Sequence, residues 1–284
     1  MSSIKILDGA MGTELARRGV ELKLPIWSSD CNLNNRELVF KIHSDYIQAG
    51  ADIITTNTFR TTSYTYRKAG FSKRDALEKA RDSFFYATDI ALKASRGKKV
   101  AGSITSVDDC YLPNNFPGEY VTEQVYQELM MWFSKTDVDF ILLETMGNII
   151  EVLIALEQAK KYNHKVWLSI ITRDGKHLLD GTCLVYFFDK LKKYDISCLL
   201  INCNSLKNTL RSIKIINKYW DGIWGCYPNL GIKELSNDYF EIIDEKLFCD
   251  NIKSIIKKNP NFIGACCGST PNHVKLINKI LKEK

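Results

Sequence analysis

Short apolar runs recur along the whole chain and alternate with amphipathic segments. Eight runs rich in Ile, Val, Leu, Phe or Thr have the length of a strand, and they lie at residues 4–9, 52–59, 99–105, 139–145, 165–172, 198–203, 222–229 and 262–268. Most are continuously apolar rather than alternating, which is typical of strands buried on both faces. The pattern therefore predicts a parallel sheet covered by other elements.

Several segments between these runs have helical periodicity. The clearest apolar stripes lie in residues 36–50, 205–220 and 269–281. Gly50 follows the first stripe as a helix stop, and the third segment opens with Thr270 as N-cap and Pro271 at the first helical position. We expect a helix over each segment.

Repeated eight times, this alternation predicts a single (βα)₈ barrel domain over residues 1–284. No linker, low-complexity tract or change of composition divides the chain. Three loop-rich stretches, residues 10–34, 106–121 and 231–250, each follow a predicted strand. Because barrels build their active sites from the loops after their strands, we expect these stretches to border the site.

Composition excludes several classes of protein. Hydrophobic residues make up 45% of the 284, enough for a full core, and the net charge of +6 comes from scattered lysines. A nucleic-acid partner would need a clustered basic stripe, which is absent from the sequence. A membrane span would need about 18 consecutive apolar residues, and a secretory signal a basic start before an apolar stretch. We expect a cytoplasmic protein with small-molecule partners, for which a homo-oligomer is possible.

Three of the nine cysteines stand at informative positions. Cys203 ends the run at 198–203, and the pair Cys266 and Cys267 ends the run at 262–268. The barrel places all three on the same rim, with Gly268 allowing the bend that the pair needs to share one ion. Three thiolates suit Zn²⁺ and leave its fourth position open to a reactant. The pattern indicates a catalytic metal site.

The alternative is that these cysteines are small core residues, since free Cys is often buried. We expect that role for the other six, Cys31, Cys110, Cys183, Cys198, Cys226 and Cys249. In a reducing compartment all nine are expected to be thiols or metal ligands rather than a disulfide framework. A disulfide between the adjacent Cys266 and Cys267 is disfavoured.

Polar residues follow the other predicted strands. Carboxylates at Asp8 and Glu144 could hold an ammonium group, and main-chain N–H groups of the turn after Asp8 could hold a carboxylate. Next to a thiol-binding metal, this describes a pocket for a thiol amino acid. The alternatives are an ion-paired rim carboxylate for Glu144 and a turn cap for Asp8. Further polar residues at strand ends are Thr55, Asn57, Thr58, Thr145, Asn202 and Asn229.

The motifs LDGAMGTEL (7–15), AGADIITTNTFRTT (49–62), LLETM (142–146), INC (201–203), YPN (227–229) and GACCGSTPNHV (264–274) resemble the homocysteine S-methyltransferase family. They occur in order over nearly the whole chain, and the two cysteine motifs are the most specific. The resemblance implies a (βα)₈ barrel, zinc held by three cysteines, and methyl transfer to homocysteine to give methionine, a step of methionine biosynthesis.

The resemblance also implies residue roles. Cys203, Cys266 and Cys267 would bind zinc, Glu144 would bind the homocysteine amino group, and Asp8 would complete that pocket. The matching motifs add Thr55, Thr58 and Asn229 as substrate-side residues. Cys203, Cys266, Cys267 and Glu144 are therefore the residues expected to carry catalysis.

The segment SITSVDDCYLP (103–113) departs from the turn that many members have after the third strand. It is expected to face the methyl donor, which makes Asp108, Asp109 and Tyr111 candidate donor-side residues. The expected donor is S-methylmethionine, S-adenosylmethionine or a betaine. Alternatives are a zinc- and thiol-binding barrel without methyl transfer, another metal-dependent barrel enzyme, and a methyltransferase acting on a different thiol or a selenol.

Overall fold

Eight parallel strands form the centre of the molecule in the computed structural model, which describes residues 4–231 and 241–283. In chain order they are β1 (Lys5–Ile6), β2 (Ile53–Thr55), β3 (Lys99–Ile104), β4 (Phe140–Met146), β5 (Val166–Ile170), β6 (Ile196–Asn202), β7 (Trp224–Tyr227) and β8 (Phe262–Ile263). Neighbours follow the order β1-β8-β7-β6-β5-β4-β3-β2, and a bridge between Leu7 and Ile53 joins the two ends. The predicted (βα)₈ barrel is confirmed.

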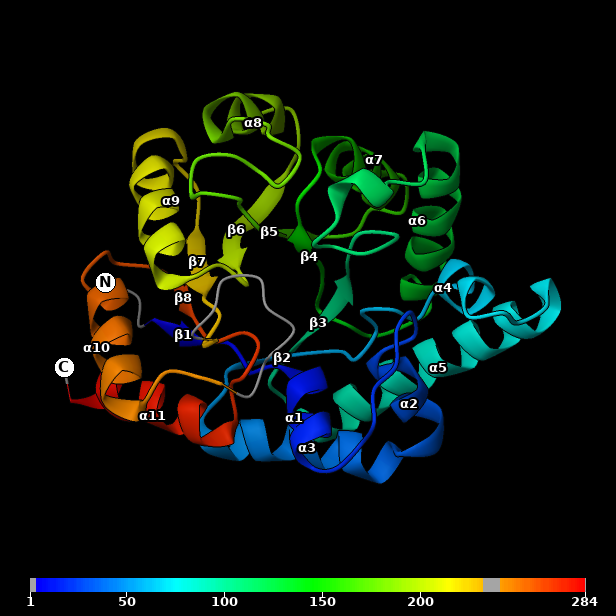
Figure 1. Ribbon diagram of the computed structural model, residues 1–284, viewed down its shortest axis with the longest axis horizontal. Coiled ribbons are helices and arrows are strands. Elements are labelled where there is room, and N and C mark those ends of the chain that lie inside the picture. The colour runs from blue at the N-terminus through cyan, green and yellow to red at the C-terminus, as the bar shows by residue number, and fades with distance from the viewer. Residues whose placement is uncertain (1–3, 232–240, 284) are drawn as a thin grey trace.

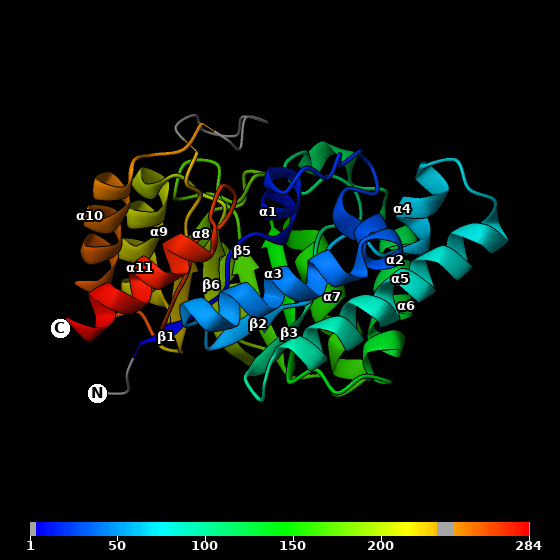
Figure 2. The same cartoon turned by 90° about the horizontal axis from the view of Figure 1, so that it is seen from below.

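Helices surround the strands on the outside (Figures 1 and 2). The α-helices are α1 (Met11–Arg17), α2 (Cys31–Asn34), α3 (Arg36–Ala49), α4 (Ser63–Lys68), α5 (Lys73–Ala94), α6 (Glu119–Phe133), α7 (Ile149–Lys161), α8 (Leu184–Leu191), α9 (Leu206–Tyr219), α10 (Glu245–Ile256) and α11 (Pro271–Lys282). Short 3₁₀ turns η1 (Ser28–Asp30) and η2 (Pro113–Asn115) lie in two of the connections. The predicted helices over 36–50, 205–220 and 269–281 correspond to α3, α9 and α11.

Several predicted boundaries differ from those of the structure. Strand β8 ends at Ile263, so Cys266 and Cys267 lie in the following loop, where the main-chain N–H of Cys266 donates to the carbonyl of Pro228. The stretch 10–34, expected to be loop, contains α1 and α2. Of the expected loop 231–250, residues 232–240 lie outside the described part, and α10 already begins at Glu245.

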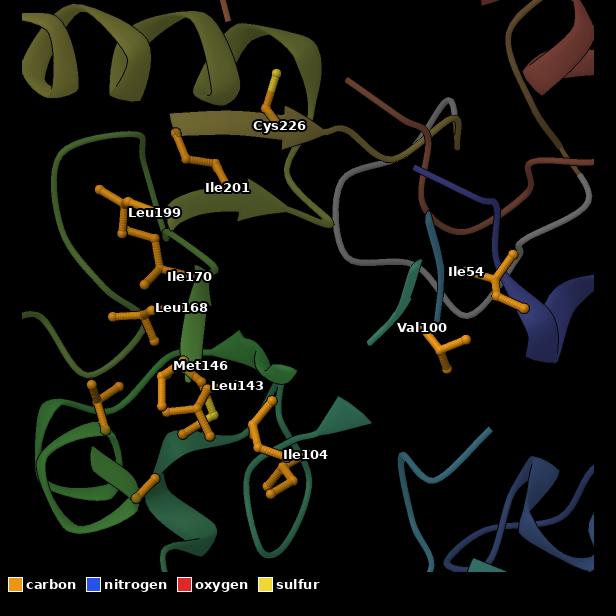
Figure 3. Packing of buried hydrophobic residues seen from close by; sticks show 14 of the residues in the cluster. Ile54, Val100, Ile104, Leu143, Met146, Leu168, Ile170, Leu199, Ile201 and Cys226 are labelled. Carbon is orange, nitrogen blue, oxygen red and sulfur yellow. The ribbon is translucent and has the colours of Figure 1, made fainter. Parts of the chain in front are cut away.

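Side chains at alternating strand positions belong to two separate apolar cores. Outward side chains such as Leu143, Leu168 and Leu199 pack against the helices, and Figure 3 shows members of this outer core along the strands. Inward neighbours such as Leu142 and Leu200 pack inside the barrel. The period of two follows from strand geometry, and burial on both faces explains why the runs in the sequence are continuously apolar.

Four of the six cysteines assigned to the core, Cys31, Cys110, Cys198 and Cys226, are buried as predicted. The assignment was wrong for Cys183, which is exposed at the N-cap of α8, and incomplete for the half-buried Cys249. Among the described residues no helix has the length and apolar character needed to cross a membrane.

Candidate active site

A cavity of about 580 Å³ opens at the carboxyl ends of the strands and reaches into the barrel. Its lower wall is aromatic, because Phe140 and Trp167 both line it and stack with their ring centroids 4.1 Å apart. Phe262 packs on the other side of Trp167, at 4.4 Å. The cavity is thus closed below by the inner core and bordered above by the loops that follow the strands.

The three predicted zinc ligands meet in this cavity. Cys203 directly follows β6, and Cys266 and Cys267 lie in the loop after β8. Their sulfur atoms lie within 4.8 Å of one another, and the Sγ of Cys267 is 4.0 Å from each of the other two. Zn–S bonds of about 2.3 Å in a tetrahedron place two sulfurs about 3.8 Å apart. The cluster therefore has the dimensions of a site for one metal ion.

The sulfurs of Cys203 and Cys266 are in direct contact, and their Cα atoms lie 5.6 Å apart. The chain segments after β6 and β8 converge over β7, which brings together two sulfurs 63 residues apart in the sequence. Both cysteines belong to the three-sulfur group that could hold a metal ion, so the expectation that they are thiols or metal ligands stays a prediction. As thiolates beside Cys267 they would fit a thiophilic metal.

Asn202, the last residue of β6, holds the first cysteine in place. Its buried amide nitrogen lies 2.6 Å from Oγ1 of Thr145 and donates to the Sγ of Cys203 at 3.5 Å, while its carbonyl oxygen accepts from Ser169. Cys203 has a φ of 51°, a left-handed conformation that is unfavourable for a side chain with a Cβ. Asn202, a polar strand-end residue without an assigned role in the sequence, therefore orients the start of the loop after β6.

The loop that carries Cys266 and Cys267 is fixed from both sides. The main-chain N–H of Leu230 donates to the carbonyl of Cys267, and that of Gly268 donates to Oγ1 of Thr13. Gly268 has a φ of 83°, the bend that the sequence predicts at this position. The two adjacent cysteines can therefore direct their sulfurs to one point.

Burial raises the pKa of the Cys267 thiol from 9.0 to about 11, and the negative charge of Glu144 adds to the rise. The hydroxyl of Tyr111, 3.9 Å from this sulfur, acts in the opposite direction. Cys267 is therefore a neutral thiol at pH 7 when no cation is near. A bound metal ion would supply the positive charge that a thiolate needs.

Asp8 and Glu144 are buried carboxylates that line the same cavity. Asp8 accepts from the main-chain N–H of Thr55 at 2.8 Å and from its hydroxyl at 3.1 Å. Glu144 accepts from Oγ of Ser103 at 2.6 Å and from the hydroxyl of Tyr227 at 3.0 Å. Neither carboxylate has a salt bridge within the described residues, so the ion-paired alternative for Glu144 finds no support there.

The surroundings favour the protonated forms of both acids. Burial raises the pKa of Asp8 from 3.8 to about 8, the N–H of Thr55 opposes this, and the charge of Glu144 adds to it. Burial also raises the pKa of Glu144, against the hydrogen bonds from Ser103 and Tyr227. A pair of buried carboxylates without a partner cation favours a positively charged ligand group, because such a group would relieve their desolvation.

Two predicted substrate-side residues form hydrogen bonds with other groups of the protein. Thr58 donates its hydroxyl to the carbonyl of Ser103, and Asn229 accepts from the main-chain N–H of Gly231. Neither is among the described residues that line the cavity. Thr55, by contrast, lines the cavity and orients Asp8. Substrate contact by Thr58 or Asn229 stays a prediction.

The segment after β3 divides into two parts. Asp109 and Tyr111 line the cavity as predicted for donor-side residues. Asp108 instead points outward to Lys68, whose Nζ lies 2.6 Å from its carboxylate, and to the hydroxyl of Tyr64. It therefore anchors the segment and does not line the cavity.

A family model described as "Homocysteine S-methyltransferase" matches residues 5–281. The chain belongs to the homocysteine S-methyltransferase family. This membership makes it an enzyme, a transferase of one-carbon groups, and it agrees with the resemblance that the sequence motifs indicate.

Curated members of the family match along nearly their whole length. Homocysteine S-methyltransferase 3 of Zea mays is 27% identical, with 98% of this chain and 90% of the relative covered. Homocysteine S-methyltransferase YbgG of Bacillus subtilis is 25% identical over 96% and 92%. A protein named selenocysteine methyltransferase, from Astragalus bisulcatus, is 24% identical over 97% and 92%.

Solved structures support the fold. The homocysteine methyltransferase MmuM of Escherichia coli superimposes with a TM-score of 0.84 in its oxidized form and 0.83 in its metallated form. Each is 24% identical, with 98% of this chain and 96% of that chain covered. At this identity the likeness shows that this family member has the same barrel.

Trp27, Phe59 and Arg60 are among the cavity residues that had no role in the sequence-based prediction. Phe59 and Arg60 lie just beyond β2 in the motif at 49–62, so a charged residue after a strand end was the available signal. Trp27 gave no signal, because its place depends on packing against Gly12 in the first turn of α1. A Cβ at Gly12 would lie 2.4 Å from the indole nitrogen.

Proposed function

We propose that the protein is a zinc-dependent S-methyltransferase that moves a methyl group from a small activated donor to homocysteine, giving methionine. One observation carries the proposal: three cysteine sulfurs converge within 4.8 Å in a cavity that two buried carboxylates also line. Membership of the family supports the reaction class. The cavity combines groups suited to a soft metal, an amino acid and a thiol.

Cys203, Cys266 and Cys267 would hold the zinc ion, with Asn202 keeping the first of them in its unfavourable backbone conformation. When bound, zinc would lower the pKa of the acceptor thiol, so that the sulfur is a nucleophile at neutral pH. The carboxylates of Glu144 and Asp8 would bind the ammonium group of the acceptor. Main-chain N–H groups of the turn after Asp8 would bind its carboxylate.

The residues of the chain orient the acceptor for the reaction. Thr55 fixes Asp8, while Ser103 and Tyr227 fix Glu144, so that the ammonium site has a defined position. The acceptor sulfur attacks the methyl carbon, forming a new S–C bond while the bond from methyl to the sulfonium or ammonium centre breaks. The leaving group keeps the electron pair and becomes neutral, and the thiol proton leaves to solvent. Holding both reactants in line supplies much of the rate enhancement.

A metal assay combined with a donor panel tests the proposal. Purified reduced protein, loaded with zinc, is supplied with homocysteine and with S-methylmethionine, S-adenosylmethionine or glycine betaine in turn. We expect about one zinc ion per chain and methionine from at least one donor. Zinc and homocysteine binding without methionine from any donor would instead indicate a binding protein that lacks methyl transfer.

A second acceptor is favoured by one relative. The protein of Astragalus bisulcatus that is named selenocysteine methyltransferase matches nearly the whole chain. A selenol ionises more readily than a thiol and would suit the same soft metal site. Competition between homocysteine and selenocysteine in one reaction, with both methylated products quantified, decides which acceptor has the higher kcat/KM.

A further inference from the structure

Arg60 is a buried cation that the chemistry at the cysteines does not use. It follows β2 along the chain, lines the cavity, and has a relative exposure of 9%. Burying a guanidinium is costly unless partners replace its hydration. The position of this side chain therefore raises the question of which group satisfies it.

The described residues satisfy Arg60 poorly. Its Nη1 lies 3.4 Å from the carbonyl of Asp108, and its Nη2 lies 4.0 Å from the carboxylate of Asp109, beyond hydrogen-bond distance. Arg18 shows the contrast, because its guanidinium lies 2.8 Å from the carboxylates of both Glu14 and Asp45. The N–H groups of Arg60 can therefore donate further hydrogen bonds to a ligand in the cavity. Those of Arg18 are already engaged by Glu14 and Asp45.

The neighbourhood of Arg60 is suited to an organic cation that also carries an acid group. The ring centroid of Phe59 lies 6.0 Å from the guanidinium carbon, and Trp27 and Tyr111 line the same cavity. Aromatic faces attract sulfonium and quaternary ammonium centres. The hydroxyl of Tyr111 lies 3.9 Å from the Sγ of Cys267, so this wall connects the arginine side with the cysteine cluster.

On the basis of the proposed function, we propose that Arg60 binds the carboxylate of the methyl donor and selects donors that are zwitterions. The planar guanidinium can bind a carboxylate through two parallel hydrogen bonds. The cationic, methyl-bearing centre then faces the aromatic wall towards the cysteines. Arg60 is accordingly a specificity-determining residue on the donor side, separate from the acceptor carboxylates.

A purely structural role would be to hold the segment 105–112 through the carbonyl of Asp108. Loss of that contact would impair every donor equally. Loss of a carboxylate-binding group would impair donors that have a carboxylate and spare analogues that lack it. The two roles therefore predict different ratios between the affinity for a donor that has a carboxylate and the affinity for its analogue without one.

The experiment measures donor binding to zinc-loaded enzyme by calorimetry, using three pairs of probes. S-methylmethionine is compared with its carboxamide, glycine betaine with its amide, and S-adenosylmethionine with its decarboxylated form. Each pair shares the cationic centre and differs in the carboxylate. Wild type is compared with Arg60→Gln and Arg60→Lys, and with Arg74→Gln as a control, because Arg74 lies on the exposed face of α5.

We expect wild type to bind the carboxylate member of at least one pair about tenfold to a hundredfold more tightly than its partner. In Arg60→Gln this ratio should fall to about one, Arg60→Lys should restore part of it, and Arg74→Gln should leave it unchanged. The analogue that lacks the carboxylate should bind all four proteins alike. Homocysteine affinity and the thermal midpoint of Arg60→Gln serve as the folding control.

Three outcomes would overturn the proposal. The first is wild type binding no carboxylate member more tightly than its analogue. The second is Arg60→Gln weakening both members of a pair equally, and the third is Arg60→Gln retaining the full ratio. The proposed function fails separately, if the enzyme makes no methionine from any donor. Methionine formation with an unchanged ratio in Arg60→Gln would leave the function intact and remove the role of Arg60.

Discussion

The acceptor side and the donor side of the cavity are built in different ways. On the proposed acceptor side, Asp8, Glu144 and Cys203 lie at strand ends. Residues of neighbouring strands orient the two carboxylates, Thr55 of β2 for Asp8 and Ser103 of β3 for Glu144, and Tyr227 of β7 reaches Glu144 from across the barrel. On the donor side, the segment 105–112 is fixed largely by helices, through Glu151 of α7 to the N–H of Val107 and through Lys68 of α4 to Asp108.

The two sides of the cavity should tolerate amino-acid substitutions to different degrees. Sheet register ties the acceptor residues to one another, so a change in one disturbs the others. The donor segment can change its cavity-facing residues while its anchors stay in place. Under the proposed function we therefore expect the acceptor site to tolerate little change, and donor preference to depend on the cavity-lining residues Arg60, Asp109 and Tyr111.

The largest effect should come from the cysteines. Replacing Cys203, Cys266 or Cys267 with serine should abolish zinc binding and lower turnover by at least about a thousandfold, because the acceptor would lose its activating charge. Metal content by mass spectrometry and methionine formation measure this, and circular dichroism should show an intact barrel. The exposed Cys183→Ser is the matched control. Full activity in a zinc-free triple variant would contradict the assignment.

Glu144→Gln tests whether homocysteine binding can be weakened without weakening the binding of the donor or of zinc. The amide loses the charge and keeps one acceptor oxygen for either Ser103 or Tyr227, while its NH₂ group can donate to the other hydroxyl. We expect the KM for homocysteine to rise by roughly a hundredfold, while the donor KM and the zinc content change little. Steady-state kinetics with each substrate varied in turn provide the measurement. Equal loss of zinc and homocysteine affinity would indicate a structural role.

The acceptor side should also respond to pH through Asp8, whose pKa is raised by burial to about 8. Below that pH, binding of an ammonium group requires Asp8 to lose its proton, so affinity should rise by up to about tenfold per pH unit towards pH 8. Methionine is the suitable ligand because it lacks a thiol. Calorimetry should show this dependence in wild type and a flat profile in Asp8→Asn. A flat wild-type profile would exclude Asp8 from the ammonium site.

The raised pKa of Asp8 also affects the free energy of unfolding. Because the folded protein holds the Asp8 proton more tightly than the unfolded chain does, the unliganded protein should lose stability as pH rises from about 4 to about 8. Asp8→Asn should remove that part of the pH dependence of the thermal midpoint. The effect should be visible in zinc-free and zinc-loaded protein alike.

The smallest effect should come from the donor-side anchor. Glu151→Ala removes the acceptor for the buried N–H of Val107, so the segment should shift and the donor KM should rise by about five- to tenfold. Glu151→Gln keeps an acceptor oxygen and should restore most of the affinity. The homocysteine KM should stay constant in both variants. An equal change in both KM values would show that the two sides are coupled.

The amino-acid sequence was enough to predict the barrel and the place of the candidate metal site. Eight continuous apolar runs specify strands buried on both faces, and parallel strands all end at one rim, so Cys203 and the pair Cys266 and Cys267 had to converge. The same reasoning placed Asp8 and Glu144 in the cavity. These conclusions needed the order of elements along the chain and no knowledge of side-chain packing.

The tertiary structure alone decided contacts between residues far apart in the chain. The contact between the sulfurs of Cys203 and Cys266, the hydrogen bonds of Asn202 to both, and the position of Tyr111 beside Cys267 depend on loop conformations that sequence periodicity does not specify. Arg60 is the clearest example. Its type and place were visible in the sequence, but its burial with unfilled donor capacity depends on how the segment 105–112 packs against β2 and α4.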